Sequence, residues 1–162
     1  MYIIHCDSSC EPFHPRGILT WAFLVKHKKQ IIHQDTEIIG WGGKHHTNNL
    51  GEMTAVLAAM QWLIRLPENK RLPAVINSDS ELIVNQCLGI YNCYDDHLLT
   101  LLEMILKAKD VYGRSAVLFK WVPREKNKEA DKLSRSLYTE EMLGIMRANK
   151  NNIIFDWDDI PF

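Results

Sequence analysis

The chain has 162 residues, which is the size of one domain that can bury a single hydrophobic core. Its residues are 46% hydrophobic and 24% charged, as in ordinary globular proteins, and no apolar run approaches the ~20 residues that span a bilayer. A net charge of −1 does not by itself indicate a nucleic-acid-binding protein. The first residues turn polar too soon for a secretion signal, so we expect a cytoplasmic monomer with no membrane contact.

The first part of the chain predicts three strands. Residues 2–6 are apolar and end at Asp7, and the Pro and Gly residues that follow indicate a turn over residues 8–17. Residues 18–25 and 30–39 have the composition of two further strands, separated by a lysine-rich turn. This order predicts an antiparallel meander.

Apolar residues then recur at helical spacing, which predicts a helix over residues 49–66. Asn48 or Asn49 is the expected N-cap, and Glu52 would lie in the first turn, where the helix dipole favours an acid. A short buried strand over residues 74–77 leads into Asp79.

The rest of the chain alternates between the two patterns. The predicted elements are helices over residues 80–88, from 98 to near 113, 127–137 and 140–148, and a strand over residues 116–122. A meander followed by alternating strands and helices predicts an α/β fold, with a mixed sheet and helices on its faces. Charge is uneven, because basic residues crowd residues 120–135 and acids gather at the end of the chain.

Four acids lie where these elements begin or end: Asp7, Glu52, Asp79 and Asp131. The ends of strands in an open α/β sheet line the crevice in which ligands bind. Carboxylates brought that close repel one another unless a cation holds them, and oxygen ligands suit Mg²⁺ or Mn²⁺. Two such ions about 4 Å apart can hydrolyse a phosphodiester. Each acid alone could equally be an ordinary turn, cap or surface residue.

Four motifs, in order along the chain, carry a family resemblance. Asp7-Ser8-Ser9-Cys10, with residues 14–17 after it, is similar to an opening Asp-Gly-Ser followed by Asn-Pro-Gly. Thr47-Asn48-Asn49-Leu50-Gly51-Glu52 matches Thr-Asn-Asn-x-x-Glu, and Ser78-Asp79-Ser80 resembles Thr-Asp-Ser. Residues 121–131 contain a closing Asn-x-x-x-Asp. Together these motifs resemble the type 1 ribonuclease H family.

The resemblance implies a ribonuclease H-like fold over residues 1–138, with a three-strand antiparallel meander and two parallel strands flanked by helices. It implies an endonuclease that hydrolyses the RNA strand of RNA–DNA hybrids and leaves 3′-hydroxyl and 5′-phosphate ends. Asp7, Glu52, Asp79 and Asp131 would then hold two Mg²⁺ ions, for which Mn²⁺ is a possible substitute.

The same resemblance suggests which residues bind the substrate. Asn48 and Asn49 would face the minor groove of the hybrid, where amides can recognise the 2′-hydroxyl. Thr47 would touch a phosphate of the DNA strand, and Arg124 can hold a phosphate. Asn127, which opens the closing motif, completes the expected set.

Three departures from the family pattern stand out. Ser8 replaces the usual glycine, so we expect crowding beside the metals. The loop that carries a histidine in many members is short here, with Arg124 nearest its place, and the basic handle is missing between Gly89 and Leu98. An arginine cannot shuttle protons at neutral pH, so product release could be slower.

Residues 139–162 form a C-terminal extension outside the fold pattern. Its acidic end resembles the tip of bacterial single-stranded-DNA-binding protein, and the expected docking residues are Asp156, Asp158, Asp159, Ile160, Pro161 and Phe162. The resemblance implies partners that bind that tip, through an apolar pocket with basic groups around it. A solubilising end, or a tail that folds onto the protein's own basic face and inhibits it, are the alternatives.

Two other functions stay open. The fold could serve as a catalytically silent module that binds a hybrid or a partner, or as a nuclease directed at DNA. The intact set of four acids favours an enzyme, and the Thr47-Asn48-Asn49 element favours the hybrid as substrate.

Overall fold

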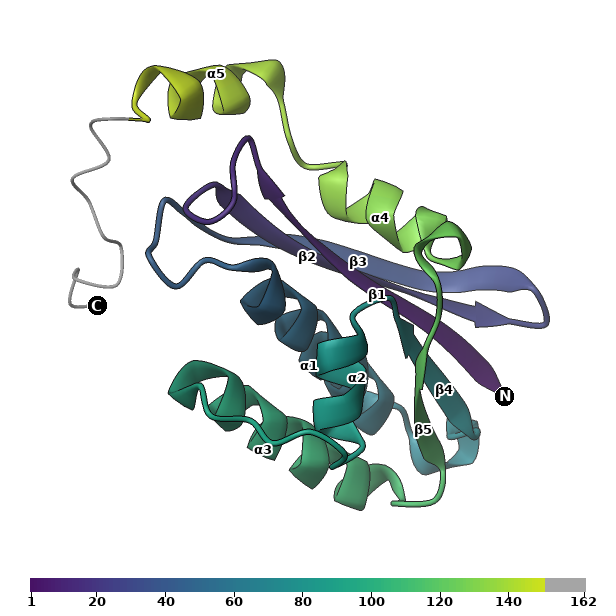
Figure 1. The fold of residues 1–162 in the computed structure, drawn as a ribbon. Helices are drawn as coiled ribbons and strands as arrows, with labels where there is room; N and C mark the ends of the chain where they lie inside the picture. The colour runs from purple at the N-terminus through teal and green to yellow at the C-terminus, as the bar shows by residue number, and fades with distance from the viewer. Residues whose placement is uncertain (151–162) are drawn as a thin grey trace.

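The computed structural model describes residues 1–150, and its centre is a five-stranded sheet in the order β3-β2-β1-β4-β5 (Figure 1). The strands are β1 (Tyr2–Glu11), β2 (Ile18–His27), β3 (Gln30–Trp41), β4 (Ala74–Ser78) and β5 (Val117–Trp121). β1, β2 and β3 pair antiparallel, whereas β4 runs parallel to both β1 and β5. The predicted mixed sheet, a meander with two parallel strands, is therefore confirmed.

Helices cover both faces of this sheet. Those on one face are α1 (Asn48–Arg65), α2 (Glu81–Cys87) and α3 (Asp96–Tyr112), and α4 (Lys128–Arg135) lies on the other (Figure 1). α5 (Glu140–Ala148) lies beyond the end of the sheet, and two short 3₁₀ turns are η1 (Glu68–Lys70) and η2 (Arg124–Lys126). No helix within residues 1–150 is long and apolar enough to cross a membrane.

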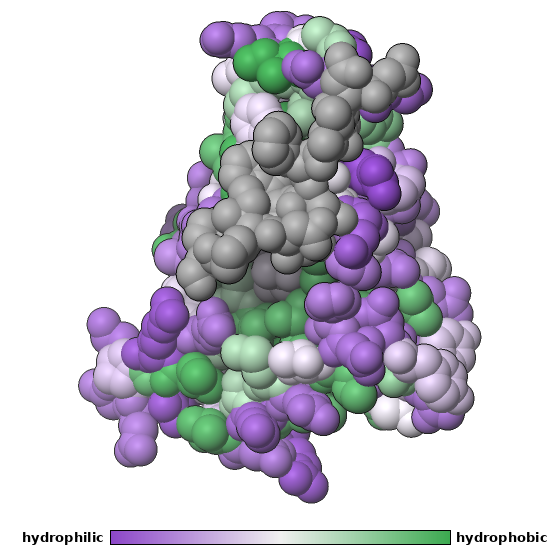
Figure 2. All heavy atoms as spheres, turned by 90° about the vertical axis from the view of Figure 1, so that its left-hand side faces the viewer, coloured by the Kyte–Doolittle hydropathy of each residue, from purple (hydrophilic) through white to green (hydrophobic). Residues whose placement is uncertain are grey.

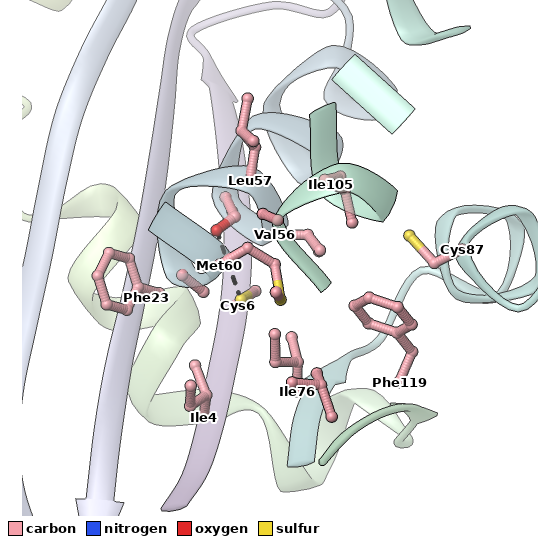
Figure 3. Close-up of a cluster of buried hydrophobic side chains, with 14 of the residues drawn as sticks. Ile4, Cys6, Phe23, Val56, Leu57, Met60, Ile76, Cys87, Ile105 and Phe119 are labelled. Carbon is pink, nitrogen blue, oxygen red and sulfur yellow. Dashed lines mark hydrogen bonds between the residues drawn. The ribbon is translucent and has the colours of Figure 1, made fainter. Parts of the chain in front are cut away.

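The main core lies between α1 and the sheet. Met53, Val56 and Met60 recur at helical spacing and are at most 2% exposed, because they pack on Ile4 and Ile76 of neighbouring strands (Figure 3). Each such side chain contributes roughly 1.5–3 kcal/mol through its burial. This packing fixes α1 against β1 and β4, and so fixes the position of Glu52 near the start of the helix.

Apolar side chains also reach the surface around α2 and α3. On the face drawn in Figure 2 they gather in its lower half, at the height of these helices in Figure 1, between polar margins. The segment between α2 and α3 exposes Ile90, Tyr91 and Tyr94 and contains no lysine or arginine.

β1 is longer than its sequence suggested. It continues to Glu11, so the turn predicted from residue 8 is wrong over its first four positions. The antiparallel partner β2 pairs with β1 as far as Glu11, but the parallel pairing with β4 ends at Cys6 and Ser78. Asp7 is therefore the first residue of β1 beyond the end of β4. Residues 6–10 are all buried, so the alternation that usually marks a strand is absent there.

The start of α1 also differs from the prediction. Thr47, not Asn48 or Asn49, is the N-cap, and its Oγ1 accepts a hydrogen bond from the Leu50 N–H at 3.3 Å. Glu52 consequently lies in the second turn, where the helix dipole has little influence on it. The helix predicted over residues 127–137 is shorter in the structure, because α4 begins at Lys128, after the irregular residue Asn127, and ends at Arg135.

The loop before α1 is built around the buried side chain of His46, which is 6% exposed. The Gly43 N–H donates to His46 Nδ1 at 3.1 Å, and the Cys10 thiol donates to the His46 carbonyl at 3.7 Å. A Cβ atom at Gly40 or Gly43 would meet the ring, so both glycines are required by its close approach. His46 therefore fixes the segment that delivers Thr47 to the start of α1.

We predict that Gly43→Ala lowers the free energy of unfolding by about 1–3 kcal/mol, because overpacking displaces a well-packed neighbour. A Cβ there would lie 2.6 Å from Cε1 of the buried His46 ring. Gly144→Ala in α5 is the matched control, because nothing lies within 4 Å of its Cβ position. It should raise stability by up to ~1 kcal/mol through helix propensity. Urea unfolding measures both, and equal effects would contradict the account of the loop.

Candidate metal centre

Three of the four predicted acids meet at one edge of the sheet. Asp7 comes from β1, Glu52 from α1 and Asp79 from the residue after β4, and one ligand oxygen of each lies within 4.8 Å of the others. They meet because Asp7 lies just past the point where β4 ends, while α1 crosses both strands. Asp7 and Glu52 are 5% and 6% exposed, and Asp79 is half-buried.

The acids line a cleft of about 260 Å³. Its other walls are Ser8, Ser9, Cys10, Glu11, Asn48, Arg124 and Arg135. The cleft therefore places buried carboxylates beside two arginines that could meet an anionic substrate.

Burial makes ionisation of these acids unfavourable. Burial first, and the charge of Asp79 as well, raise the pKa of Asp7 from its usual 3.8 to about 6, although a hydrogen bond with Glu52 acts to lower it. Burial, and then the charge of Asp7, raises the pKa of Glu52 well above its usual value, and burial raises that of Asp79. Since every member of the cluster is an acid, a divalent cation among them would remove the repulsion and favour their ionised forms.

Serine side chains hold Glu52 in place. Ser8 donates to Glu52 Oε1 from both its N–H and its hydroxyl, each at 3.2 Å. The Ser78 hydroxyl donates to Glu52 Oε2 at 3.1 Å, so both carboxylate oxygens are fixed. The Ser8 N–H also lies 2.9 Å from Asp7 Oδ1. These hydrogen bonds orient Glu52, and they become charge-assisted, and therefore stronger, once a cation favours its ionised form.

The crowding expected from Ser8 does not occur, because Gly51 of α1 leaves room for it. A Cβ atom at Gly51 would lie 2.5 Å from Ser8 Cβ. The Ser8 hydroxyl is directed at α1, where it also lies 3.1 Å from the Asn48 carbonyl. The glycine at this junction is therefore Gly51 on the helix, whereas the family pattern has its glycine on the strand, at the position of Ser8.

Asp131, the fourth predicted acid, does not join the other three. Its Oδ1 accepts from Arg135 Nε at 3.1 Å, and Arg135 Nη1 also pairs with Glu11 Oε1 at 2.6 Å. Asp131 is nevertheless near enough for its charge to raise the pKa of Asp7 and of Asp79. It lies at the margin of the site, held by an arginine that the sequence analysis did not single out.

The predicted substrate residues divide between two clefts. Arg124 and Asn48 are exposed at the acidic cleft. Thr47 and Asn49 line a second cleft of about 330 Å³ between the loop before α1 and the start of α3. Asn48 and Asn49, adjacent in sequence, therefore link the two clefts.

The second cleft contains residues that sequence reasoning missed. The rings of His45 and His97 lie 4.5 Å apart between their centroids, and Gln86 contributes a buried amide. The three residues come from a loop and two helices, so no local motif could have indicated them.

The prediction that Asn127 binds substrate does not fit its position, because its side chain is 1% exposed. Its Nδ2 donates to the Cys6 carbonyl at 2.8 Å, and its Oδ1 lies 3.2 Å from His5 Nδ1. From the start of α4, Asn127 instead fixes β1 directly before Asp7, and its side chain also hydrogen-bonds Asp79, which acts to lower the pKa of that acid. A buried amide that satisfies a strand carbonyl is a structural contact.

We predict that Asp7→Asn makes the metal-free protein more stable at pH 7 than the wild type. A buried acid with a raised pKa binds its proton more tightly in the folded state. Its stabilising contribution is therefore complete below about pH 4 and is lost as the pH rises through about 6. At about 1.4 kcal/mol per pKa unit, the rise from 3.8 to about 6 corresponds to at most roughly 3 kcal/mol.

Urea unfolding from pH 4 to 7 in the presence of a chelator tests this. Asp110→Asn is the control, because Asp110 is exposed on α3 and paired with Arg114, and it should keep the wild-type pH dependence. If Asp7→Asn also kept that dependence, Asp7 would not be an unfavourably buried acid.

Solved structures resemble this one over most of its length. LC11-RNase H1, isolated from compost by a metagenomic approach and crystallised in complex with RNA/DNA hybrid, is 26% identical, with a TM-score of 0.70. The match covers 82% of this chain and 93% of that chain. The N-terminal RNase H domain of Rv2228c from Mycobacterium tuberculosis is 20% identical over 92% of this chain and 97% of its own, also with a TM-score of 0.70.

RNase H1 from the halophilic archaeon Halobacterium salinarum is 19% identical over 82% of this chain and 92% of its own, with a TM-score of 0.66. These likenesses show a ribonuclease H-like fold. A family model described as reverse transcriptase-like matches residues 31–137, a range that contains Glu52, Asp79 and Asp131 but begins after Asp7. Because that range is more than half of the chain, the protein belongs to the reverse transcriptase-like family.

Proposed function

We propose that this protein is a ribonuclease H, a metal-dependent endonuclease that hydrolyses the RNA strand of RNA–DNA hybrids and leaves 3′-hydroxyl and 5′-phosphate ends. The observation that carries the proposal is the buried cluster of Asp7, Glu52 and Asp79, whose ligand oxygens lie within 4.8 Å of one another at an accessible cleft. The fold is that of LC11-RNase H1, which was crystallised with RNA/DNA hybrid, and this likeness supports the choice of substrate.

The side chains present fit a divalent metal. All the donors are carboxylate oxygens, which suit Mg²⁺ and Mn²⁺, and a cation would favour the ionised state that burial opposes. Asp7, Glu52 and Asp79 would hold the metal, and Asp131 would complete the set of ligands for two ions. Bound there, two metal ions would activate a water molecule and stabilise the leaving oxygen of the phosphodiester.

The remaining residues would position the hybrid. Asn48 is exposed at the first cleft and Asn49 at the second, where their amides can hydrogen-bond base edges and 2′-hydroxyls. Arg124 would hold a phosphate at the acidic cleft, and Thr47 would contact a phosphate of the DNA strand at the second cleft. Thr47 is also the N-cap of α1. Its hydroxyl can accept the capping hydrogen bond and still donate one to a phosphate.

The alternatives are a catalytically silent binding module and a nuclease directed at DNA. Burying three acids together destabilises the fold at neutral pH, and a module that only binds a hybrid has no use for them. The exposed Asn48 and Asn49 amides favour a substrate that carries 2′-hydroxyls over duplex DNA.

A cleavage assay tests the proposal. Labelled RNA–DNA hybrid, double-stranded RNA and double-stranded DNA are each incubated with the protein in Mg²⁺, in Mn²⁺ and in chelator. We expect the RNA strand of the hybrid alone to be cut, only when metal is present. Because metal ions contribute several kcal/mol to such reactions, Asp79→Asn should lower kcat/KM by at least ~100-fold.

Asp110→Asn is the matched control, because it makes the same chemical change at an exposed aspartate of α3 outside both clefts. It should cleave like the wild type. Binding of the hybrid without cleavage in any metal would contradict the proposal and favour the silent binding module. Cleavage of double-stranded DNA would favour the nuclease directed at DNA.

We further propose that residues 1–138 are the catalytic domain and that residues 139–162 are an extension that docks onto partners. The docking residues Asp156, Asp158, Asp159, Ile160, Pro161 and Phe162 lie outside the described residues 1–150. Support comes from the sequence alone, since an aromatic residue after several acids suits an apolar pocket with basic groups around it. The partners would be proteins that bind the tip of single-stranded-DNA-binding protein.

A peptide of residues 150–162 should capture a purified protein of that class, and the same peptide without Phe162 should not. Equal capture by both peptides would refute docking. If the extension instead inhibits the enzyme, removing residues 151–162 should raise the rate of hybrid cleavage.

A further inference from the structure

Ser8 and Gly51 face each other across the junction of β1 and α1, beside the acidic cluster. Ser8 follows Asp7 in the strand, and Gly51 precedes Glu52 in the helix. A Cβ atom at Gly51 would lie 2.5 Å from Ser8 Cβ and 2.9 Å from Ser8 Oγ, distances that no packing can absorb. Only one of the two positions can carry a side chain, and in this protein it is the strand position.

That side chain is a hydroxyl with two acceptors in reach. Ser8 Oγ lies 3.2 Å from Glu52 Oε1 and 3.1 Å from the Asn48 carbonyl, but a hydroxyl has one proton to donate. The Ser8 N–H donates to the same Glu52 oxygen, so the hydroxyl proton directed there gives that oxygen two donors from one residue. Ser8 is 8% exposed, so water competes weakly for either bond.

We propose that Ser8 is a positioning residue for Glu52 and that Gly51 is the residue that makes room for it. With the Ser8 N–H on the same oxygen and Ser78 on the other, the hydroxyl holds Glu52 turned toward Asp7 and Asp79 before metal binds. The inference rests on the proposed metal site. It assigns to Ser8 a hydrogen bond that a glycine at the same position could not make.

Three variants distinguish the contribution of the Ser8 hydroxyl from that of the packing between positions 8 and 51. Ser8→Ala removes the hydroxyl and keeps the Cβ. Gly51→Ala adds a Cβ atom that clashes with Ser8. The double variant Ser8→Gly with Gly51→Ala moves the Cβ from the strand to the helix, and the nearest remaining contact is then Leu19 Cδ1 at 3.0 Å, the end of a side chain that can shift. Ser136→Ala is the control, because this exposed serine in the segment after α4 donates only to the Leu133 carbonyl.

Two readouts are needed: the midpoint of thermal unfolding in chelator, and the Kd for Mn²⁺ by titration calorimetry. Ser8→Ala should lower the midpoint by only a few degrees, as the loss of one hydrogen bond does, and raise the Kd about tenfold, the usual loss when a partner of a metal ligand is removed. Gly51→Ala should lower the midpoint, and the double variant should recover most of that loss. The Kd of the double variant should stay raised, because it still lacks the hydroxyl. Ser136→Ala should change neither value.

The outcomes separate the two proposals. If the wild type does not bind Mn²⁺, the proposed metal site is wrong, and this inference fails with it. If the wild type binds but Ser8→Ala binds equally well, only the role of Ser8 is wrong. A double variant no more stable than Gly51→Ala would refute the pairing, and one that regains the wild-type Kd would show that packing, not the hydroxyl, positions Glu52.

Discussion

The structure depends on the sheet geometry that holds three acids together, two of them buried and one half-buried, in spite of their mutual repulsion. β4 ends at Ser78 while β1 continues past Asp7, so Asp7 and Asp79 emerge side by side where the parallel pairing stops. α1 packs across both strands through its apolar face and brings Glu52 to the same place. The free energy gained by burying the apolar face of α1 keeps these acids close. It opposes the electrostatic repulsion that would separate them.

The surroundings of the cluster make that arrangement rigid. Serines hold both oxygens of Glu52, and Asn127 holds the strand directly before Asp7. The buried ring of His46 fixes the loop that leads to the cap of α1. Arg135 forms ion pairs with both Asp131 and Glu11, beside the cluster. In the proposed reaction metal binding and the arginine would therefore compete for Asp131, while the other three acids are already in place.

Sequence patterns predicted the elements well where periodicity is strong and the contacts are local. The helical stripe of α1, the meander and the position of Asp79 directly after β4 could all be predicted in this way. The end of β1 could not, because residues 6–10 are buried on both faces and show no alternation. The contacts of Asn127 could not be predicted either, because its partners lie on β1 and directly after β4, far from it in the sequence. The pairing of Ser8 with Gly51 likewise depends on how a strand and a helix approach each other.

The most direct test of the account is a crystal structure of the protein soaked in Mn²⁺, with anomalous difference maps recorded at the manganese edge. We expect a peak within coordination distance of carboxylate oxygens of Asp7, Glu52 and Asp79. We also expect Asp131 to have left Arg135 wherever a second peak is present. A map with no peak at the cluster at saturating Mn²⁺, with the three carboxylates unchanged, would contradict the central claim that these buried acids are held together to bind metal.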